Sequence, residues 1–180
     1  MSRINAIYGT GGFAREVIPI LNQQHPNDDN IFVVHKEYLT SEKSINGYSV
    51  MSYEDFIDIP SKEKSITVAI SDASIRSRVS SVINQDGIRQ SSIISNKSVM
   101  MDEVSISNGA IICPFVTITS NIRVGQNFHA NIYSYVAHDC IIGDNVTFAP
   151  SVKCNGNVII EDNVYIGTGA IIKQGKSNNP

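Results

Sequence analysis

One histidine of the sequence stands in a setting that suits acid–base chemistry. His138 is followed directly by Asp139, and it lies two residues after Val136, an apolar position of a repeat described below. An imidazole has an ordinary pKa near 6.5, so it is largely neutral at cellular pH and can accept a proton, and an adjoining carboxylate can orient it. Two residues past an inward-facing position, the side chain is expected to point outward into a cleft. The pair therefore indicates a general base that takes a proton from a substrate group.

A glycine-rich turn near the N-terminus is the second candidate for chemistry. The run from Gly9 to Ala14 (GTGGFA) matches the pattern G-x-G-x-x-G/A, and it follows an apolar strand at residues 4–8 and precedes a helix-like spacing of apolar residues. In this pattern the glycines let the backbone approach a phosphate, and the helix N-terminus offers free N–H groups to it. Dinucleotide enzymes carry an acidic residue after the second strand, whereas Val34 is followed here by His35, which disfavours NAD. A tight turn without a ligand is the alternative.

The elements around this turn predict a small parallel α/β domain. Further strands are expected at residues 31–34 and 66–70, and a helix is expected to begin after Ser71 or Asp72. Strands that alternate with helices indicate a parallel sheet of the Rossmann-like kind.

The second half of the chain repeats with a period of six residues. From Ile94 to Ile172 every sixth residue is apolar, and the residue four places after each of these is apolar or small. Helical cores recur near every 3.6 residues and strand cores every two, so neither element explains this period. Short strands that bend at each repeat do explain it, with three hexads in one triangular turn and stacked turns around a continuous apolar column. The spacing predicts a parallel β-helix, and an ordinary β-sandwich is disfavoured.

These patterns divide the chain into an α/β domain over residues 1–87, a β-helix over residues 88–176 and a tail over residues 177–180. The formal charge of −3 and the pI near 5.7 give no reason to expect nucleic acid or an anionic membrane as a partner. No apolar run is long enough to span a bilayer, and no secretory signal is present, so a cytoplasmic protein is expected. The three cysteines match no zinc motif and are expected to be buried, and no metal is expected.

Both halves together resemble the NeuD/PglD family of sugar acyltransferases, which includes N-acetyltransferases of nucleotide-linked 4-amino-sugars. The most specific matching stretches are residues 8–16, 137–146 and 153–158. The resemblance implies a left-handed β-helix, acetyl-CoA as the co-substrate and a nucleotide-sugar acceptor in lipopolysaccharide, capsule or other glycan biosynthesis. It also implies a homotrimer whose active sites lie between neighbouring coils. Relatives continue for several more hexads with a C-terminal CoA-binding segment, whereas this sequence ends at Pro180, so whether the chain is truncated is left open.

The resemblance further assigns roles to individual residues. His138 matches the proposed general base, and Asp139 matches the acidic neighbour that positions it. The positions that match the acceptor site are Gly9, Thr10, Gly11, Gly12, Phe13, His35, Ser71, Asp72, Arg76, Asn131 and Thr147. The positions that match the acyl-CoA cleft are Asn155, Gly156, Gly167 and Thr168. His35 stands where relatives often carry an acidic pair that reads the base or ribose, so the identity of the nucleotide base is left open. Thr147 stands where some relatives carry a second active-site histidine, so the contribution of that histidine is left open as well.

Three other functions share features with this sequence. The γ-type carbonic anhydrases use the same coil but need three histidines around zinc, and only His129 and His138 lie in the repeat, so this function is disfavoured. Acetylation of a sugar hydroxyl, as on a sialic acid, is the nearest enzymatic alternative. A trimeric scaffold that binds without catalysis is the non-enzymatic alternative, because a fold alone does not establish a function.

Overall fold

The computed structural model describes residues 3–60 and 63–176, and the chain divides into two compact units, Met1–Ile93 and Ile94–Pro180. The tail expected at residues 177–180 lies outside the described residues. No helix of the described ranges has the length and apolar character that a membrane span requires.

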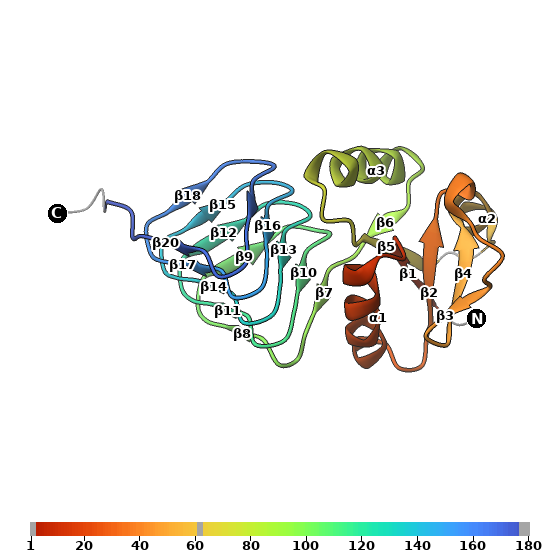
Figure 1. Ribbon diagram of the computed structural model, residues 1–180, viewed down its shortest axis with the longest axis horizontal. Coiled ribbons are helices and arrows are strands. Elements are labelled where there is room, and N and C mark those ends of the chain that lie inside the picture. The colour runs from red at the N-terminus through yellow and green to blue at the C-terminus, as the bar shows by residue number, and fades with distance from the viewer. Residues whose placement is uncertain (1–2, 61–62, 177–180) are drawn as a thin grey trace. The chain divides into compact units, whose positions relative to one another are not determined.

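The first unit is an α/β sheet with helices on its faces (Figure 1). Its described residues form a six-stranded sheet in the order β3-β4-β2-β1-β5-β6. The strands are β1 (Ile4–Tyr8), β2 (Asp29–Val34), β3 (Ser44–Ile45), β4 (Tyr48–Ser52), β5 (Lys64–Val68) and β6 (Arg89–Gln90). The helices are α1 (Gly12–Gln24), the 3₁₀ turn η1 (Lys36–Tyr38), α2 (Tyr53–Asp58) and α3 (Ala73–Gln85). The predicted strand–turn–helix alternation is confirmed.

Two details differ from the sequence-based expectation. The sheet is mixed, because β3 pairs antiparallel with β4 through the turn Asn46-Gly47, whose residues have φ of 51° and 83°. Two positive φ angles characterise the tight Asn-Gly hairpin turn, which explains why the chain reverses there. The third strand, expected at residues 66–70, instead spans Lys64–Val68, because the chain leaves the sheet at Ala69 and Ile70 to form the rim of a cleft.

The core of the first unit follows from the alternation of strand side chains. Inward residues of β1, β2 and β5 pack with α2 and α3 in one cluster: Ala6, Ile31, Val33, Tyr53, Phe56, Ile66, Val68 and Ile83. Helix α1 buries its own apolar stripe, which includes Val17, Ile18 and Leu21, and it continues through the exposed Pro19.

The second unit is a parallel β-helix, as the sixfold period predicts. Three sheets have the orders β19-β16-β13-β10-β7, β20-β17-β14-β11-β8 and β18-β15-β12-β9, so successive strands pass to successive faces (Figure 1). The strands are β7 (Ile93–Ile94), β8 (Val99–Met100), β9 (Val104–Ile106), β10 (Ile111–Ile112), β11 (Thr117–Ile118), β12 (Ile122–Val124), β13 (His129–Ala130), β14 (Tyr135–Val136), β15 (Ile141–Ile142), β16 (Thr147–Phe148), β17 (Lys153–Cys154), β18 (Ile159–Ile160), β19 (Tyr165–Ile166) and β20 (Ile171–Ile172). Paired residues such as Tyr135 and Lys153 are 18 apart, which is one turn of three hexads.

The interior of the β-helix contains the apolar residues of the repeat, and bends separate its short strands. Val136, Phe148 and Cys154 have no exposed surface, and all three cysteines are buried. Several corners require a left-handed backbone, and they are occupied mainly by residues that tolerate it: Asn121, Asn127, Asp139, Asn145, Asn157 and Asn163. The bends that the sixfold period predicts between the short strands are therefore confirmed.

Candidate active site and nucleotide cleft

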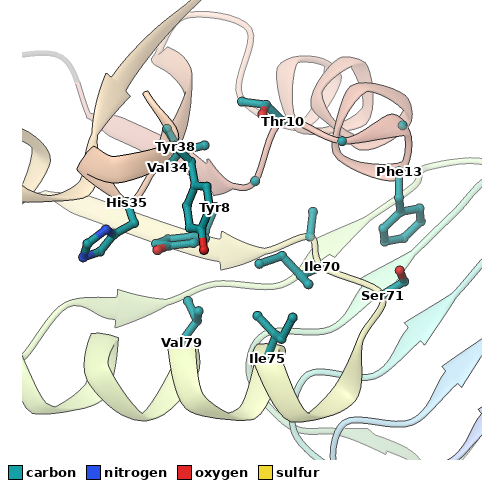
Figure 2. Close-up of a pocket in the computed structure, with 14 residues that line it drawn as sticks. Tyr8, Thr10, Phe13, Val34, His35, Tyr38, Ile70, Ser71, Ile75 and Val79 are labelled. Carbon is teal, nitrogen blue, oxygen red and sulfur yellow. The ribbon is translucent and has the colours of Figure 1, made fainter. Parts of the chain in front are cut away.

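A cleft of about 450 Å³ lies at the carboxyl ends of β1, β2 and β5. The glycine turn forms one wall, and Figure 2 shows Ile75 and Val79 of α3 pointing toward Tyr8 from the opposite wall. In α/β sheets, ligands bind outside the carboxyl ends of the strands, where loops from neighbouring strands diverge. The cleft therefore occupies the position expected for a ligand site in this fold.

The glycine turn brings two loops together and leaves a helix N-terminus open. Gly9 has φ of 117°, and a β-carbon there would lie 3.3 Å from the carbonyl oxygen of Ala69, so a side chain at this position would be strained. Gly11 is the N-cap of α1 and supplies no side-chain hydrogen bond, and the first turn of the helix has no acidic residue. The N-terminus of α1 therefore suits an anion such as a phosphate, because neither a side-chain cap nor a carboxylate occupies its first turn.

Seven of the residues predicted for the first unit line this cleft: Gly9, Thr10, Gly11, Gly12, Phe13, His35 and Ser71. Asp72 and Arg76 are not among the lining residues, and they hold the loop instead. Asp72 caps α3 through a 2.8 Å bond from the Ile75 N–H, which is the main reason why the pKa of this carboxyl is lowered.

Arg76 is fully buried, and its Nη1 donates to the carbonyls of Ile70 at 2.6 Å and Ser71 at 3.1 Å. Burial lowers the pKa of Arg76 to about 10.

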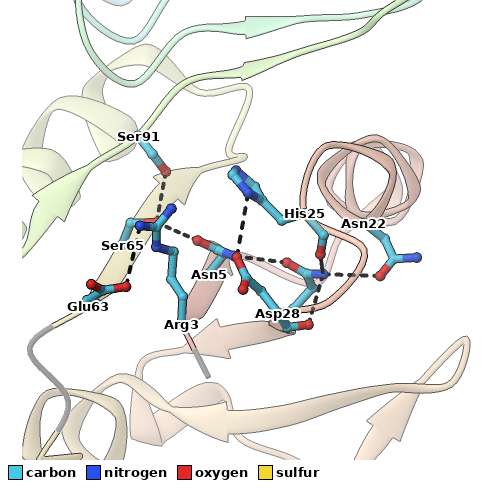
Figure 3. A network of polar contacts seen from close by, with 9 residues as sticks. Arg3, Asn5, Asn22, His25, Asp28, Glu63, Ser65 and Ser91 are labelled. Atoms are coloured by element: carbon cyan, nitrogen blue, oxygen red, sulfur yellow. Dashed lines mark hydrogen bonds and ion pairs between the residues drawn. The ribbon is translucent and has the colours of Figure 1, made fainter. Parts of the chain in front are cut away.

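A polar network fixes the amino ends of the same strands, at the edge of the sheet opposite the cleft (Figure 3). The buried Asn5 of β1 donates to Asp28 at 3.1 Å and to Asn30 of β2 at 3.2 Å, and it accepts from the Ser65 hydroxyl of β5 at 3.0 Å. Three adjacent strands are thereby joined through side chains as well as through backbone bonds. This network sets the relative register from which the cleft loops emerge.

The side chain of His35 lies beside two carboxylates that were not predicted as site residues. Its Nε2 is 3.2 Å from Glu54 Oε1, and its Nδ1 is 3.6 Å from Glu37 Oε1. Glu54 Oε2 also accepts from the Lys36 N–H at 3.1 Å, so Glu54 fixes the start of η1. Acidic groups therefore do stand next to the end of β2, but they come from η1 and α2. No spacing in the sequence signals that Glu54 returns to this place.

The second candidate site is built at the corner between β14 and β15. Asp139 has φ of 59°, and this bend brings its carboxylate back to the preceding residue, where Oδ2 lies 2.7 Å from His138 Nδ1. Asn121, one coil earlier, donates from Nδ2 to Asp139 Oδ1 at 3.1 Å. The side chains of His138 and Asp139 are 51% and 45% exposed, so the pair is accessible to a substrate.

The charge of Asp139 fixes which imidazole nitrogen is free. Hydrogen bonds from His138 and then from Asn121 hold the pKa of Asp139 below its ordinary value, so the group is a carboxylate at neutral pH. A carboxylate can only accept hydrogen bonds, so the proton of a neutral His138 resides on Nδ1. Nε2 then carries the lone pair that can take a proton from a substrate.

Gly156 lies against the imidazole from the next coil. A β-carbon at Gly156 would be 2.5 Å from His138 Cε1 and 2.6 Å from Nε2. The main chain also holds this corner, since the Asn157 N–H donates to the His138 carbonyl at 2.9 Å. Gly156 was predicted as part of the acyl-CoA cleft, and its structural contact is with the histidine.

The remaining predicted residues lie elsewhere on the coil. Asn131 is at the preceding corner, where its Oδ1 accepts from the Ile132 N–H, and Thr147 is buried on β16 of a different face. The side chain of Asn155 makes two hydrogen bonds. Its Nδ2 donates to the Ile172 carbonyl at 2.7 Å, and its Oδ1 accepts from the Tyr135 hydroxyl at 2.9 Å. Gly167 and Thr168 are exposed. A single chain does not bring Asn131 or Thr147 to His138.

No three histidine, cysteine, aspartate or glutamate residues gather as a metal site within residues 3–60 and 63–176. The second coil histidine, His129, is buried on β13.

Each of the two units contains a segment that matches a known protein family. Residues 6–83 match the family described as the PglD N-terminal domain, and residues 121–156 match the bacterial transferase hexapeptide (six repeats). A GDP-perosamine N-acetyltransferase of Escherichia coli O157:H7 is 50% identical over 176 residues, which make up 97% of this chain and 80% of that protein. The chain belongs to the NeuD/PglD-like family of sugar acyltransferases. As a member of this family it is an acyltransferase, which confirms the class of enzyme predicted from the sequence.

Solved structures share the fold of this NeuD/PglD-like chain. WeeI from Acinetobacter baumannii AYE has a TM-score of 0.93 and 47% identity, with 99% of this chain and 84% of that chain covered. A mutant of perosamine N-acetyltransferase from Caulobacter crescentus, in complex with CoA and GDP-perosamine, has a TM-score of 0.77 at 17% identity, with 94% and 88% covered. The latter likeness concerns the fold alone. The coil is the left-handed β-helix of these enzymes, as the resemblance implied.

Proposed function

We propose that this protein transfers the acetyl group of acetyl-CoA to the 4-amino group of a GDP-linked sugar, with His138 as the general base. The observation that carries the choice of substrate is the 50% identity, along 97% of the chain, to an enzyme named GDP-perosamine N-acetyltransferase. The solved perosamine N-acetyltransferase of the same fold holds CoA and GDP-perosamine, which supports both ligands.

The nucleotide is proposed to bind in the cleft of the first unit. Its diphosphate would meet the glycine turn and the open N-terminus of α1, where neither a side-chain cap nor an acidic residue competes for the N–H groups. Arg76 would act indirectly, because it fixes the carbonyls of Ile70 and Ser71 and hence the opposite rim.

The acetyl transfer is proposed to be direct. The amine nitrogen attacks the thioester carbonyl carbon while His138 Nε2 takes a proton from that nitrogen, and the carbon–sulfur bond then breaks. The CoA sulfur leaves with its electron pair and receives the proton back from the His138 imidazolium, so the products are an N-acetyl sugar, CoA thiol and the neutral imidazole. Asp139 stabilises the transient imidazolium through its 2.7 Å contact with Nδ1. The cysteines are buried, which disfavours a covalent acyl-enzyme.

We also propose a homotrimer that acts in surface-glycan synthesis, with each active site shared between coils. The placement of Asn131 and Thr147 on other parts of the coil than His138 supports a shared site, because their contribution to the same site would have to come from a neighbouring protomer.

An acceptor panel tests this function. The protein with acetyl-CoA is offered GDP-, UDP- and dTDP-linked 4-amino-sugars, the matching 4-hydroxy sugars and a free sialic acid, and products are followed by mass spectrometry. We expect acetylation of the GDP-linked amine at a kcat/KM at least tenfold above every other acceptor. Preference for a hydroxyl acceptor would replace the proposal with O-acetylation, and failure of calorimetry to detect CoA binding would favour a scaffold.

A further inference from the structure

One edge of the β-helix carries Asn121 and Asp139 on successive coils. The strands that follow them pair in register, with Arg123 opposite Ile141, so the two corners stack on each other. Asn121 and Asp139 have φ of 61° and 59°, so their side chains leave the backbone at equivalent places. Stacked corners with the same backbone conformation bring the side chain of one coil beside that of the next.

The contact between these two side chains has a defined polarity. Asn121 Nδ2 lies 3.1 Å from Asp139 Oδ1, and Asp139 Oδ2 lies 2.7 Å from His138 Nδ1. An ionised carboxylate only accepts hydrogen bonds, so Asn121 must present its amide nitrogen, and not its amide oxygen, to Asp139. The carboxylate therefore uses one oxygen for Asn121 and the other for His138.

The two contacts together fix the plane of the Asp139 carboxylate. The torsion that turns a carboxylate about its own axis has broad minima, so one hydrogen bond leaves the plane loosely defined. The side chain of Asp139 is 45% exposed, so packing alone leaves it room to turn. Asn121 supplies the second anchor, and the plane that it sets aims Oδ2 at the imidazole.

Another edge of the coil shows what a purely structural contact of this kind looks like. Asn127 Nδ2 donates to Asn145 Oδ1 at 3.2 Å, and both side chains are buried neutral amides. The bond from Asn121 is exposed and ends on the carboxylate that holds His138. Because water competes for exposed polar groups, this bond affects side-chain orientation more than the free energy of unfolding.

We infer that Asn121 is a positioning residue, which holds Asp139 so that the proton of the neutral His138 imidazole stays on Nδ1. An orienting carboxylate selects the tautomer of a catalytic imidazole and leaves the other nitrogen free to accept a proton. When the carboxylate turns away, the proton can move to Nε2, and this tautomer has no lone pair at the nitrogen that the proposed reaction uses. The catalytic consequence of the inference rests on the proposed function, whereas its structural part does not.

Asn121→Gly removes the amide and keeps the corner, because glycine adopts a left-handed backbone without strain. Nitrogen-15 NMR of the imidazoles at about pH 9, where histidine is neutral, distinguishes the two tautomers, and the spectrum of His138→Ala identifies the signals of His138. The wild type is expected to show the Nδ1–H tautomer, and Asn121→Gly is expected to show a mixture of both. The kcat of Asn121→Gly should fall about tenfold, as loss of one hydrogen bond to a charged group predicts, with KM unchanged.

Two further variants separate the amide from the corner. Asn121→Asp keeps the size of the side chain and a residue type that tolerates the left-handed backbone, but it presents an oxygen in place of the amide nitrogen. It should therefore give a mixture of tautomers as well. Asn163→Gly is the matched control, because Asn163 is an exposed corner residue with the same φ of 61° on another edge. It should keep the wild-type tautomer and kcat.

The outcomes separate this inference from the proposed function. If the wild type lacks the Nδ1–H tautomer, or if either Asn121 variant keeps the wild-type tautomer, Asn121 does not position the pair, even where the wild type acetylates a GDP-linked amine. An equal fall in kcat for Asn163→Gly would overturn the inference too, since any corner substitution would then have the same effect. If both Asn121 variants change the tautomer while the wild type acetylates no nucleotide-linked amine, the positioning role stands and the acetyl-transfer proposal fails.

Discussion

The imidazole of His138 lies against the α-carbon of Gly156, so closely that a β-carbon at position 156 would be 2.5 Å from Cε1. The two residues are 18 apart, which is one coil of the β-helix. Glycine is therefore needed beneath the ring, and the ring orientation is set from one side by backbone and from the other by Asp139.

Gly156→Ala is expected to lower kcat by about 100-fold, because displacement of a catalytic group by about 1 Å is enough for a loss of this size. The nearest atoms belong to the outer end of an exposed side chain that can swing away, so the free energy of unfolding should change by less than about 1 kcal/mol. Steady-state kinetics and urea unfolding measure the two effects.

Gly143→Ala is the matched control on another corner of the coil. A β-carbon there would be 2.7 Å from the Asp162 backbone nitrogen, which cannot move freely, so a loss of about 1–3 kcal/mol in unfolding free energy is expected with kcat retained. Unchanged kcat in Gly156→Ala would show that the ring position observed here is not the one used in turnover.

Asn121→Ala is expected to raise the pKa of Asp139. Hydrogen bonds from His138 and from Asn121 hold this pKa below the ordinary value of 3.8, and the substitution removes the second bond. Because the folded-state pKa is the lower one, the carboxylate stabilises the fold fully above the unfolded value and loses this contribution as the pH falls through the folded value. The stability difference between wild type and variant should therefore be present at pH 7 and fade below about pH 4.

Carbon-detected NMR titration of the Asp139 carboxyl checks the Asn121 prediction directly. Asn108→Ala, at an exposed asparagine of the same β-helix, should leave the titration of Asp139 unchanged. An identical Asp139 pKa in wild type and Asn121→Ala would mean that the 3.1 Å contact contributes nothing in solution.

Arg76→Ala is expected to lower the free energy of unfolding by about 2–4 kcal/mol, since two loop carbonyls lose their donor and a buried volume is left empty. GDP affinity should fall as well, because Ile70 and Ser71 line the cleft. Arg78→Ala, at an exposed arginine of the same helix, should change stability by no more than about 0.5 kcal/mol. Equal unfolding midpoints for the two variants would argue against a supporting role for Arg76.

The sixfold period of the sequence predicts the β-helix. The same spacing also accounts for two contacts of the candidate active site. Inward positions such as Val136 and Phe148 are buried because one residue per hexad must face the column. With three hexads per coil, any residue contacts its neighbours 18 positions away, so the pairs His138–Gly156 and Asn121–Asp139 follow from the spacing alone. No site role was predicted for Asn121, although it lies one coil before Asp139.

Other features depend on packing that a single sequence does not display. Arg76 looked like a ligand-binding cation, but its side chain turns inward to the loop carbonyls. Glu54 returns to His35 only because α2 begins beside the end of β2, and its distance along the chain carries no periodic signal. The Asn46-Gly47 hairpin did carry a signal, since this dipeptide marks tight turns, yet no strand was expected on either side of it.

The most direct test of the account is the kinetics of His138→Ala with acetyl-CoA and a GDP-linked 4-amino-sugar. A general base contributes about 100- to 10,000-fold, so kcat should fall by at least 100-fold while calorimetry shows CoA and GDP affinities within about twofold of wild type. A kcat within about threefold of the wild-type value, measured on folded protein that binds both ligands, would contradict the assignment of His138 as the proton acceptor.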